Sequence, residues 1–129
     1  MSNPAVLIID DDPSHLRIYG WIIQGAGFIA LPMLISRTEF DLPQGPIDLV
    51  LLDYHLNGVP ATEVASEVRR SFPEAPIVVL SDALMLPDDI SPHVQGFVRK
   101  GNPERLVETV RRMLGGQSAN RDTLQLKSR

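Results

Sequence analysis

Four short apolar runs stand out along the chain, and each of them leads into a polar or charged residue. They cover residues 6–9, 49–52, 77–80 and 96–98. Continuous apolar runs of this length are typical of strands that are buried on both faces, as in a parallel sheet. A further run at residues 28–31 predicts one more short strand. We therefore expect five strands, at about residues 5–10, 28–31, 48–52, 77–81 and 96–99.

The stretches between these strands carry the periodicity of amphipathic helices. Helices are expected at about residues 14–26, 61–72 and 103–114. Asp12 and Asn102 are each expected to cap the helix that follows, because each precedes a proline that suits a first helical turn. Gly115-Gly116 is expected to end the last helix.

Two other stretches have weaker helical signals, because prolines interrupt them. Residues 36–45 predict only a weak helix, cut short by Pro43 and Pro46. Residues 83–94 contain two prolines of their own, which leave room for about one helical turn on either side. We expect this second stretch to be irregular, so that the fourth helix of the fold is abbreviated or missing.

Alternating strands and helices predict an α/β fold with a doubly wound, five-stranded parallel sheet. The chain has 129 residues, which is enough for one domain with a single core and hardly enough for two. We place this domain at residues 1–116 and expect residues 117–129 to form a polar, disordered tail.

Composition and charge narrow the classes of function. The chain has no cysteine, which excludes disulfides, thiolate metal sites and cysteine catalysis. It shows no signal-peptide pattern and no apolar run near the length of a membrane span, so we expect a cytoplasmic protein. A net charge of −4 argues against direct nucleic-acid binding. Basic residues gather at the end, where residues 99–129 hold 8 Lys and Arg against 3 acids. We interpret this end as a solvated helix face, with a partner-binding tail as the alternative.

The candidate chemistry lies at the carboxyl ends of the predicted strands. Asp10-Asp11, Asp53, Ser81 and Lys100 each stand at or just after the end of such a strand. In an open parallel sheet the site lies beyond these ends, so the side chains would converge on one pocket. Clustered carboxylates repel one another unless a cation lies among them, and hard oxygen ligands suit Mg²⁺. The sequence therefore predicts a magnesium site.

These segments, in this order and spacing, resemble the receiver domain of two-component response regulators. The matching segments are Leu7–Pro13, Asp48–Asp53, Ile77–Ser81 and Gly96–Lys100, and the resemblance covers about residues 5–115. It implies a flavodoxin-like fold with strand order 2-1-3-4-5. It also implies a single-domain response regulator, which is a signalling protein and not an enzyme.

The resemblance assigns the central role to Asp53. This carboxylate would accept a phosphoryl group from a phosphohistidine of a sensor histidine kinase or phosphotransfer protein. Asp10, Asp11 and Asp53, with the backbone carbonyl of His55, would hold Mg²⁺. The chemistry agrees with these residue types, because a carboxylate nucleophile needs no deprotonation at pH 7. Phosphoryl transfer depends mostly on positioning and charge neutralisation.

The resemblance also implies roles for the residues of the later strands. Ser81 and Lys100 would bind the phosphoryl group, and Phe97 stands where the family often has a switching tyrosine. Among the departures from the family pattern, which include Ala61 in place of a usual glycine eight positions after Asp53, two bear on the pocket. Gly101 replaces the usual proline after the lysine, which predicts a looser loop. Asp82 replaces a small residue and is expected to repel or obstruct the phosphoryl group.

Two other functions are open. A pseudo-receiver would act as an interaction module without phosphorylation, as Asp82, Gly101 and the short fourth helix suggest. A Mg²⁺-dependent hydrolase with an aspartyl nucleophile is disfavoured, because His55 stands where such enzymes commonly have a second acid. His15 is interpreted as a helix-surface residue, and His55 and His93 as loop residues. The expected partners are the kinase and an unidentified downstream protein, and homodimer formation is open.

Overall fold

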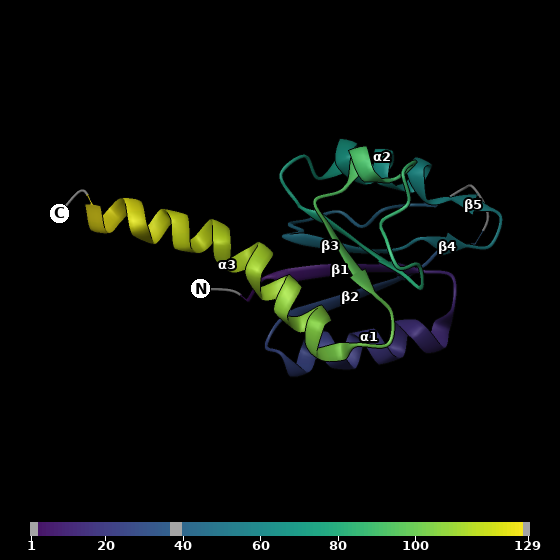
Figure 1. Ribbon diagram of the computed structural model, residues 1–129, viewed down its shortest axis with the longest axis horizontal. Coiled ribbons are helices and arrows are strands. Elements are labelled where there is room, and N and C mark those ends of the chain that lie inside the picture. The colour runs from purple at the N-terminus through teal and green to yellow at the C-terminus, as the bar shows by residue number, and fades with distance from the viewer. Residues whose placement is uncertain (1–2, 37–39, 128–129) are drawn as a thin grey trace.

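A five-stranded parallel sheet forms the centre of the structure, a computed structural model that describes residues 3–36 and 40–127, with side-chain burial up to Gly115. The strand order is β2-β1-β3-β6-β7 (Figure 1). This order matches the predicted 2-1-3-4-5, counted over the strands of this sheet. The strands are β1 Ala5–Asp10, β2 Ile29–Leu34, β3 Leu49–Asp53, β6 Ile77–Ser81 and β7 Gly96–Arg99.

Helices cover both faces of the sheet. α1 (Pro13–Gly25) and α3 (Pro103–Lys127) lie on one face, and α2 (Ala61–Ser71) lies on the other (Figure 1). Both predicted caps are confirmed. The Asp12 carboxylate accepts a hydrogen bond of 2.8 Å from the Ser14 amide. The Asn102 side chain accepts one of 3.0 Å from the Arg105 amide. Each cap satisfies a backbone donor that the first helical turn leaves without a partner.

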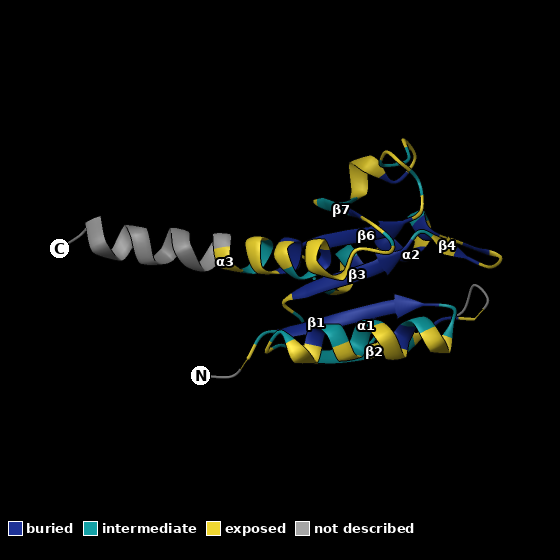
Figure 2. Cartoon of the chain, turned by 60° about the horizontal axis from the view of Figure 1, so that its bottom comes forward, coloured by how far each residue is buried: buried dark blue, intermediate teal, exposed yellow. Residues whose placement is uncertain are grey.

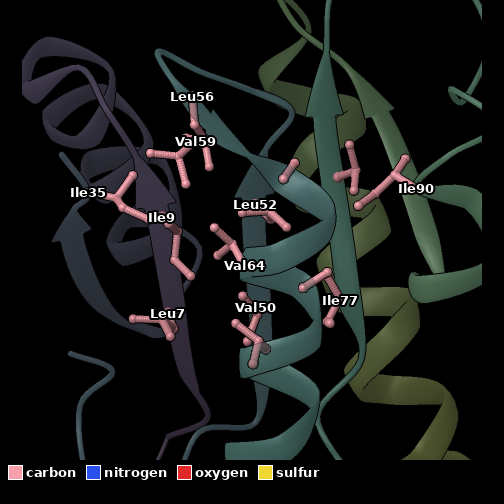
Figure 3. Packing of buried hydrophobic residues seen from close by; sticks show 14 of the residues in the cluster. Leu7, Ile9, Ile35, Val50, Leu52, Leu56, Val59, Val64, Ile77 and Ile90 are labelled. Atoms are coloured by element: carbon pink, nitrogen blue, oxygen red, sulfur yellow. The ribbon is translucent and has the colours of Figure 1, made fainter. Parts of the chain in front are cut away.

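The core has two layers, because successive residues of a strand point to opposite faces of the sheet. β1, β3 and β6 are buried along their whole length, as the continuous apolar runs predict (Figure 2). Figure 3 shows the layer between the sheet and α2, to which Leu7, Ile9, Val50, Leu52 and Val64 contribute. The layer on the other face includes Val6, Ile8, Leu51, Leu16, Ile23, Leu106 and Val110.

Two connections beside α2 have no α-helix among the described residues. The weak helix predicted at 36–45 is wrong for residues 36 and 40–45, which are irregular, and the rest of it lies outside the described residues. Pro43 and Pro46 explain this, since each removes a backbone donor. The irregular stretch at 83–94 is confirmed, with a single 3₁₀ turn, η1, at Ser91–His93. The described chain therefore has three α-helices.

Two further details differ from the prediction. The expected loop after Asp53 contains a small antiparallel hairpin, β4 (His55–Leu56) and β5 (Val59–Pro60), with Gly58 at a φ of +77° in its turn. The last helix does not end at Gly115-Gly116, because α3 runs on to Lys127. Glycine in a helix interior costs only about 1 kcal/mol relative to alanine, so it does not have to stop a helix. The division into a domain and a tail stays a prediction.

None of the helices in the described part of the chain combines the length and the apolar character that crossing a bilayer requires.

Candidate functional site

The sheet register brings the predicted acidic residues together. Asp10 and Asp53 end the neighbouring strands β1 and β3, and the residues just before them are paired in the ladder. Ser81 ends β6, which pairs with the other side of β3. All three residues are buried, with 1%, 1% and 0% of their surface exposed, respectively. Two carboxylates and a hydroxyl thus lie at one edge of the sheet with little access to water.

Lys100 supplies the positive charge of this pocket. Its Nζ lies 2.8 Å from Oδ1 of Asp53, and 13% of its side chain is exposed. Its backbone amide donates a 2.9 Å hydrogen bond to the Ser81 carbonyl, which extends the ladder between β6 and β7. Gly101 follows with a φ of +91°, a left-handed conformation that favours glycine. Lys100 therefore reaches Asp53 although Gly101 follows it, and the looser loop expected from Gly101 stays a prediction.

The ion pair shifts the titration of Lys100. Burial alone lowers the pKa of this amine, but the hydrogen bond and the negative charge of Asp53 outweigh burial and raise the pKa above its ordinary value. Lys100 is therefore charged at neutral pH. Oδ1 of Asp53 also accepts a 3.2 Å hydrogen bond from the His55 amide. Two donors thus hold one oxygen of the Asp53 carboxylate in place.

Asp10 is the electrostatically strained group of the pocket. Burial first, and then the negative charge of Asp53, raise the pKa of its carboxyl from 3.8 to about 7. Its Oδ1 accepts a 3.0 Å hydrogen bond from the Asp12 amide. Its Oδ2 is buried and has no hydrogen-bond partner. A buried carboxylate oxygen without a donor is costly, and a bound cation would remove that cost.

Asp11 and His15 each make a contact that the sequence analysis does not predict. Oδ2 of Asp11 accepts a 2.9 Å hydrogen bond from the Asn57 amide in the β4–β5 turn, and the role of Asp11 as a metal ligand stays a prediction. Asp10, His15 and Asp53 form a described group of potential metal ligands within 4.8 Å of one another. The side chain of His15 is 42% exposed, as its interpretation as a helix-surface residue expects, but that interpretation does not include the approach to Asp10. The position of His15 three residues after Asp12 is a signal for its 3.6 Å contact with Asp12 and not for that approach.

The remaining predicted residues lie around the rim. The Ser81 hydroxyl accepts a 3.1 Å hydrogen bond from the Ala83 amide. The side chain of Asp82 is exposed, which does not support the expected obstruction of the pocket. Phe97 is half-buried and packs against the core layer below α2. The side chain of His55 is exposed, and the predicted role of its carbonyl as a metal ligand stays a prediction.

Comparison with known proteins decides the family. The model of the response regulator receiver domain matches residues 6–111. The chain belongs to this family. This match confirms the resemblance inferred from the strand-end residues. Receiver domains are signalling modules of two-component systems. The five-stranded sheet order is likewise that of the chemotaxis-type receivers to which the chain is similar.

Several relatives show how far the likeness of this receiver extends. The transcriptional regulatory protein BaeR of Escherichia coli is 34% identical over 83 residues, which are 62% of this chain and 33% of BaeR. GlrR of the same species is 24% identical over 73% of this chain and 22% of GlrR. The receiver thus spans at most 33% of these curated relatives.

Solved structures match over nearly all of the receiver. The response regulator TrrA of Thermotoga maritima, in a complex with Mg²⁺-BeF, is 25% identical with a TM-score of 0.71, over 86% of this chain and 99% of that chain. The chemotaxis protein CheY4 of Vibrio cholerae is 20% identical with a TM-score of 0.73, over 88% and 100%. TrrA has also been solved in a complex with the histidine kinase ThkA.

Proposed function

We propose that Asp53 accepts a phosphoryl group from a phosphohistidine of a sensor histidine kinase or phosphotransfer protein, in a reaction that requires Mg²⁺. One observation carries the proposal. The buried Asp53 carboxylate is fixed through Oδ1 by Lys100 and the His55 amide, next to a second buried carboxylate whose Oδ2 has no partner. Such a site holds a nucleophile in one orientation and leaves a place for a cation.

The transfer follows from the roles of the two Asp53 oxygens. Because Oδ1 is engaged by two donors, Oδ2 is the atom that would attack phosphorus. The new O–P bond gives an acyl phosphate while the P–N bond of the phosphohistidine breaks, and the donor imidazole takes up a proton. Lys100 stays within reach of the transferred group and neutralises part of its charge. Ser81 would turn from the Ala83 amide to donate its hydroxyl proton to a phosphoryl oxygen.

The pocket residues fit Mg²⁺. Asp10 and Asp53 supply hard oxygen ligands at one point, and the unpartnered Oδ2 of Asp10 is the feature that a cation would satisfy. Asp11 and the His55 carbonyl stay proposed ligands beside them. When bound, the ion supplies positive charge against the carboxylates and the transferring phosphoryl group.

The pseudo-receiver alternative loses two of its three supports. Asp82 is exposed and does not fill the pocket, and Lys100 reaches Asp53 although Gly101 replaces the usual proline. The missing fourth helix affects the output surface and not the pocket.

A downstream protein, homodimer formation and the single-domain arrangement stay predictions. The proposed output surface is the basic part of α3 with Arg105, Arg111 and Arg112, together with the basic residues that follow, in place of the family's usual face around Phe97. Arg105 and Arg112 line a groove of about 590 Å³ beside Lys100.

A small-molecule phosphodonor tests this function. Incubation with acetyl phosphate and Mg²⁺, followed by intact mass spectrometry, should add one phosphoryl group to the wild-type chain. Asp53→Asn should gain none, and neither should the wild type in EDTA. Asp82→Asn is the matched control and should react like the wild type. Modification of Asp53→Asn at the wild-type level would refute the assignment.

A further inference from the structure

His15 stands over the acidic pocket in an arrangement that phosphoryl transfer does not explain. Its Nδ1 is buried and has no hydrogen-bond partner, as is also true of Oδ2 of Asp10. The two atoms lie 3.5 Å apart, which is beyond normal hydrogen-bond length. Two facing polar atoms that are buried and unsatisfied indicate a missing partner between them.

The other face of the imidazole indicates which form of His15 is present. Its Nε2 lies 3.6 Å from Oδ2 of Asp12, the carboxylate whose Oδ1 caps α1. This separation is also beyond normal hydrogen-bond length, but the negative charge on this side of the ring favours the tautomer that carries its proton on Nε2. The lone pair of Nδ1 is then directed toward Asp10 and Asp53. In metal sites a carboxylate commonly lies behind a ligating histidine and orients its ring in this way.

We propose that His15 is a metal ligand in this pocket, so that the receiver binds a divalent transition metal through one nitrogen and the oxygens of Asp10 and Asp53. The three side chains offer ligand atoms within 4.8 Å of one another. Imidazole nitrogen suits cobalt, nickel and zinc better than magnesium, which prefers oxygen alone. The site should therefore bind a transition metal more tightly than Mg²⁺, while Mg²⁺ still binds through the oxygens alone. This inference rests on the proposed function only in placing a cation beside Asp53.

Competing positions for the ion are less suited within the described chain. The side chains of the other two histidines, His55 and His93, are exposed, and Asp11, whose Oδ2 accepts from the Asn57 amide, would offer oxygen and not nitrogen. The ring of His15 also packs beside Tyr19, with centroids 6.1 Å apart and planes at 56°. This contact allows a matched variant, because His15→Phe keeps an aromatic ring at this position and removes the nitrogen.

Metal titration measures the contribution of His15 directly. Co²⁺ and Mg²⁺ are titrated separately into the metal-free chain by calorimetry, and the Co²⁺ complex is followed by its visible absorption. In His15→Phe and His15→Ala, Co²⁺ affinity should fall by at least about tenfold, with a change in the absorption band, while Mg²⁺ affinity changes by less than about threefold. Asp12→Asn keeps a good helix cap and should weaken Co²⁺ binding by about tenfold. His93→Ala is the control and should bind both metals like the wild type.

Each result decides the proposal. Unchanged Co²⁺ affinity and absorption in both His15 variants, with circular dichroism showing a folded chain, would mean that His15 only pairs with Asp10. An equal loss of Co²⁺ and Mg²⁺ affinity would mean that His15 supports the pocket by packing, and this too overturns the proposal. Acceptance of a phosphoryl group by Asp53 is measured separately with Mg²⁺, so either claim can fail while the other stands.

Discussion

Asp10 offers the sharpest test of the electrostatics of the pocket. In metal-free protein we expect Asp10→Asn to be more stable than the wild type at neutral and alkaline pH. Asparagine keeps the shape of the side chain, and its Oδ1 can still accept the hydrogen bond from the Asp12 amide. It removes the negative charge that is buried beside Asp53. Removal of this buried charge should therefore strengthen the fold.

The size of this effect follows from the pKa of Asp10. Burial first, and then the charge of Asp53, raise this pKa from 3.8 to about 7. The folded protein thus holds the proton more tightly than the unfolded chain, and the stability of the wild type falls as pH rises between these two values. At about 1.4 kcal/mol for each factor of ten, the full difference is about 4 kcal/mol. Relaxation around a buried charge reduces this cost, so we expect an advantage of about 1–4 kcal/mol for the variant above pH 7.

Urea unfolding in EDTA, followed by circular dichroism across a pH series, measures the difference between the two proteins. The advantage of Asp10→Asn should grow as pH rises from 3.8 to about 7 and stay constant above that. Saturating Mg²⁺ should stabilise the wild type, by about 2.7 kcal/mol at a hundredfold excess over Kd, and the variant much less. A stability difference that stays the same at every pH would refute the assignment of the strain to Asp10.

Three further substitutions test other parts of the account. Lys100→Met should destabilise the metal-free protein by about 3 kcal/mol at pH 8, because Asp53 loses the cation that lies 2.8 Å away, and Mg²⁺ should restore part of the loss in urea unfolding. Gln95→Ala should lower the free energy of unfolding by about 2 kcal/mol in the same assay, since Oε1 of Gln95 accepts hydrogen bonds from both Arg69 and the Ile77 amide. Gly96→Ala should lower the free energy of unfolding by about 1 kcal/mol, measured by thermal unfolding. The added Cβ would lie 2.8 Å from Cε of the flexible Met113 side chain and 3.2 Å from Cγ2 of Val78. If one of these variants is as stable as the wild type, that result contradicts the contact named for its residue.

Local signals account for what the sequence predicts correctly. Apolar runs that end in Asp10, Asp53 and Ser81 define both the strands and the edge where the site lies, since parallel strands share a carboxyl edge. Asp12 and Asn102 act as helix caps because capping depends on residues only a few positions apart.

The errors arise where local signals compete or where distant residues meet. Pro43 and Pro46 prevent helix formation more completely than the weak periodicity of residues 36–45 suggests. The Asn57-Gly58 pair is itself a strong hairpin signal, which the interpretation as a loop overlooks. The contact of His15 with Asp10 depends on how α1 leaves the sheet, and the sequence alone does not give that angle.

The central claim is that Asp53 is the residue that carries the phosphoryl group. The most direct measurement treats the chain with a phosphodonor and Mg²⁺, reduces the acyl phosphate with borohydride, and locates the product by peptide mass spectrometry. Borohydride converts a phosphorylated aspartate to homoserine and leaves a free carboxylate unchanged. The account predicts homoserine at position 53 and at no other aspartate. Homoserine at position 10, 11 or 82 with an unmodified Asp53, or a phosphoryl group on a histidine or serine alone, would contradict it.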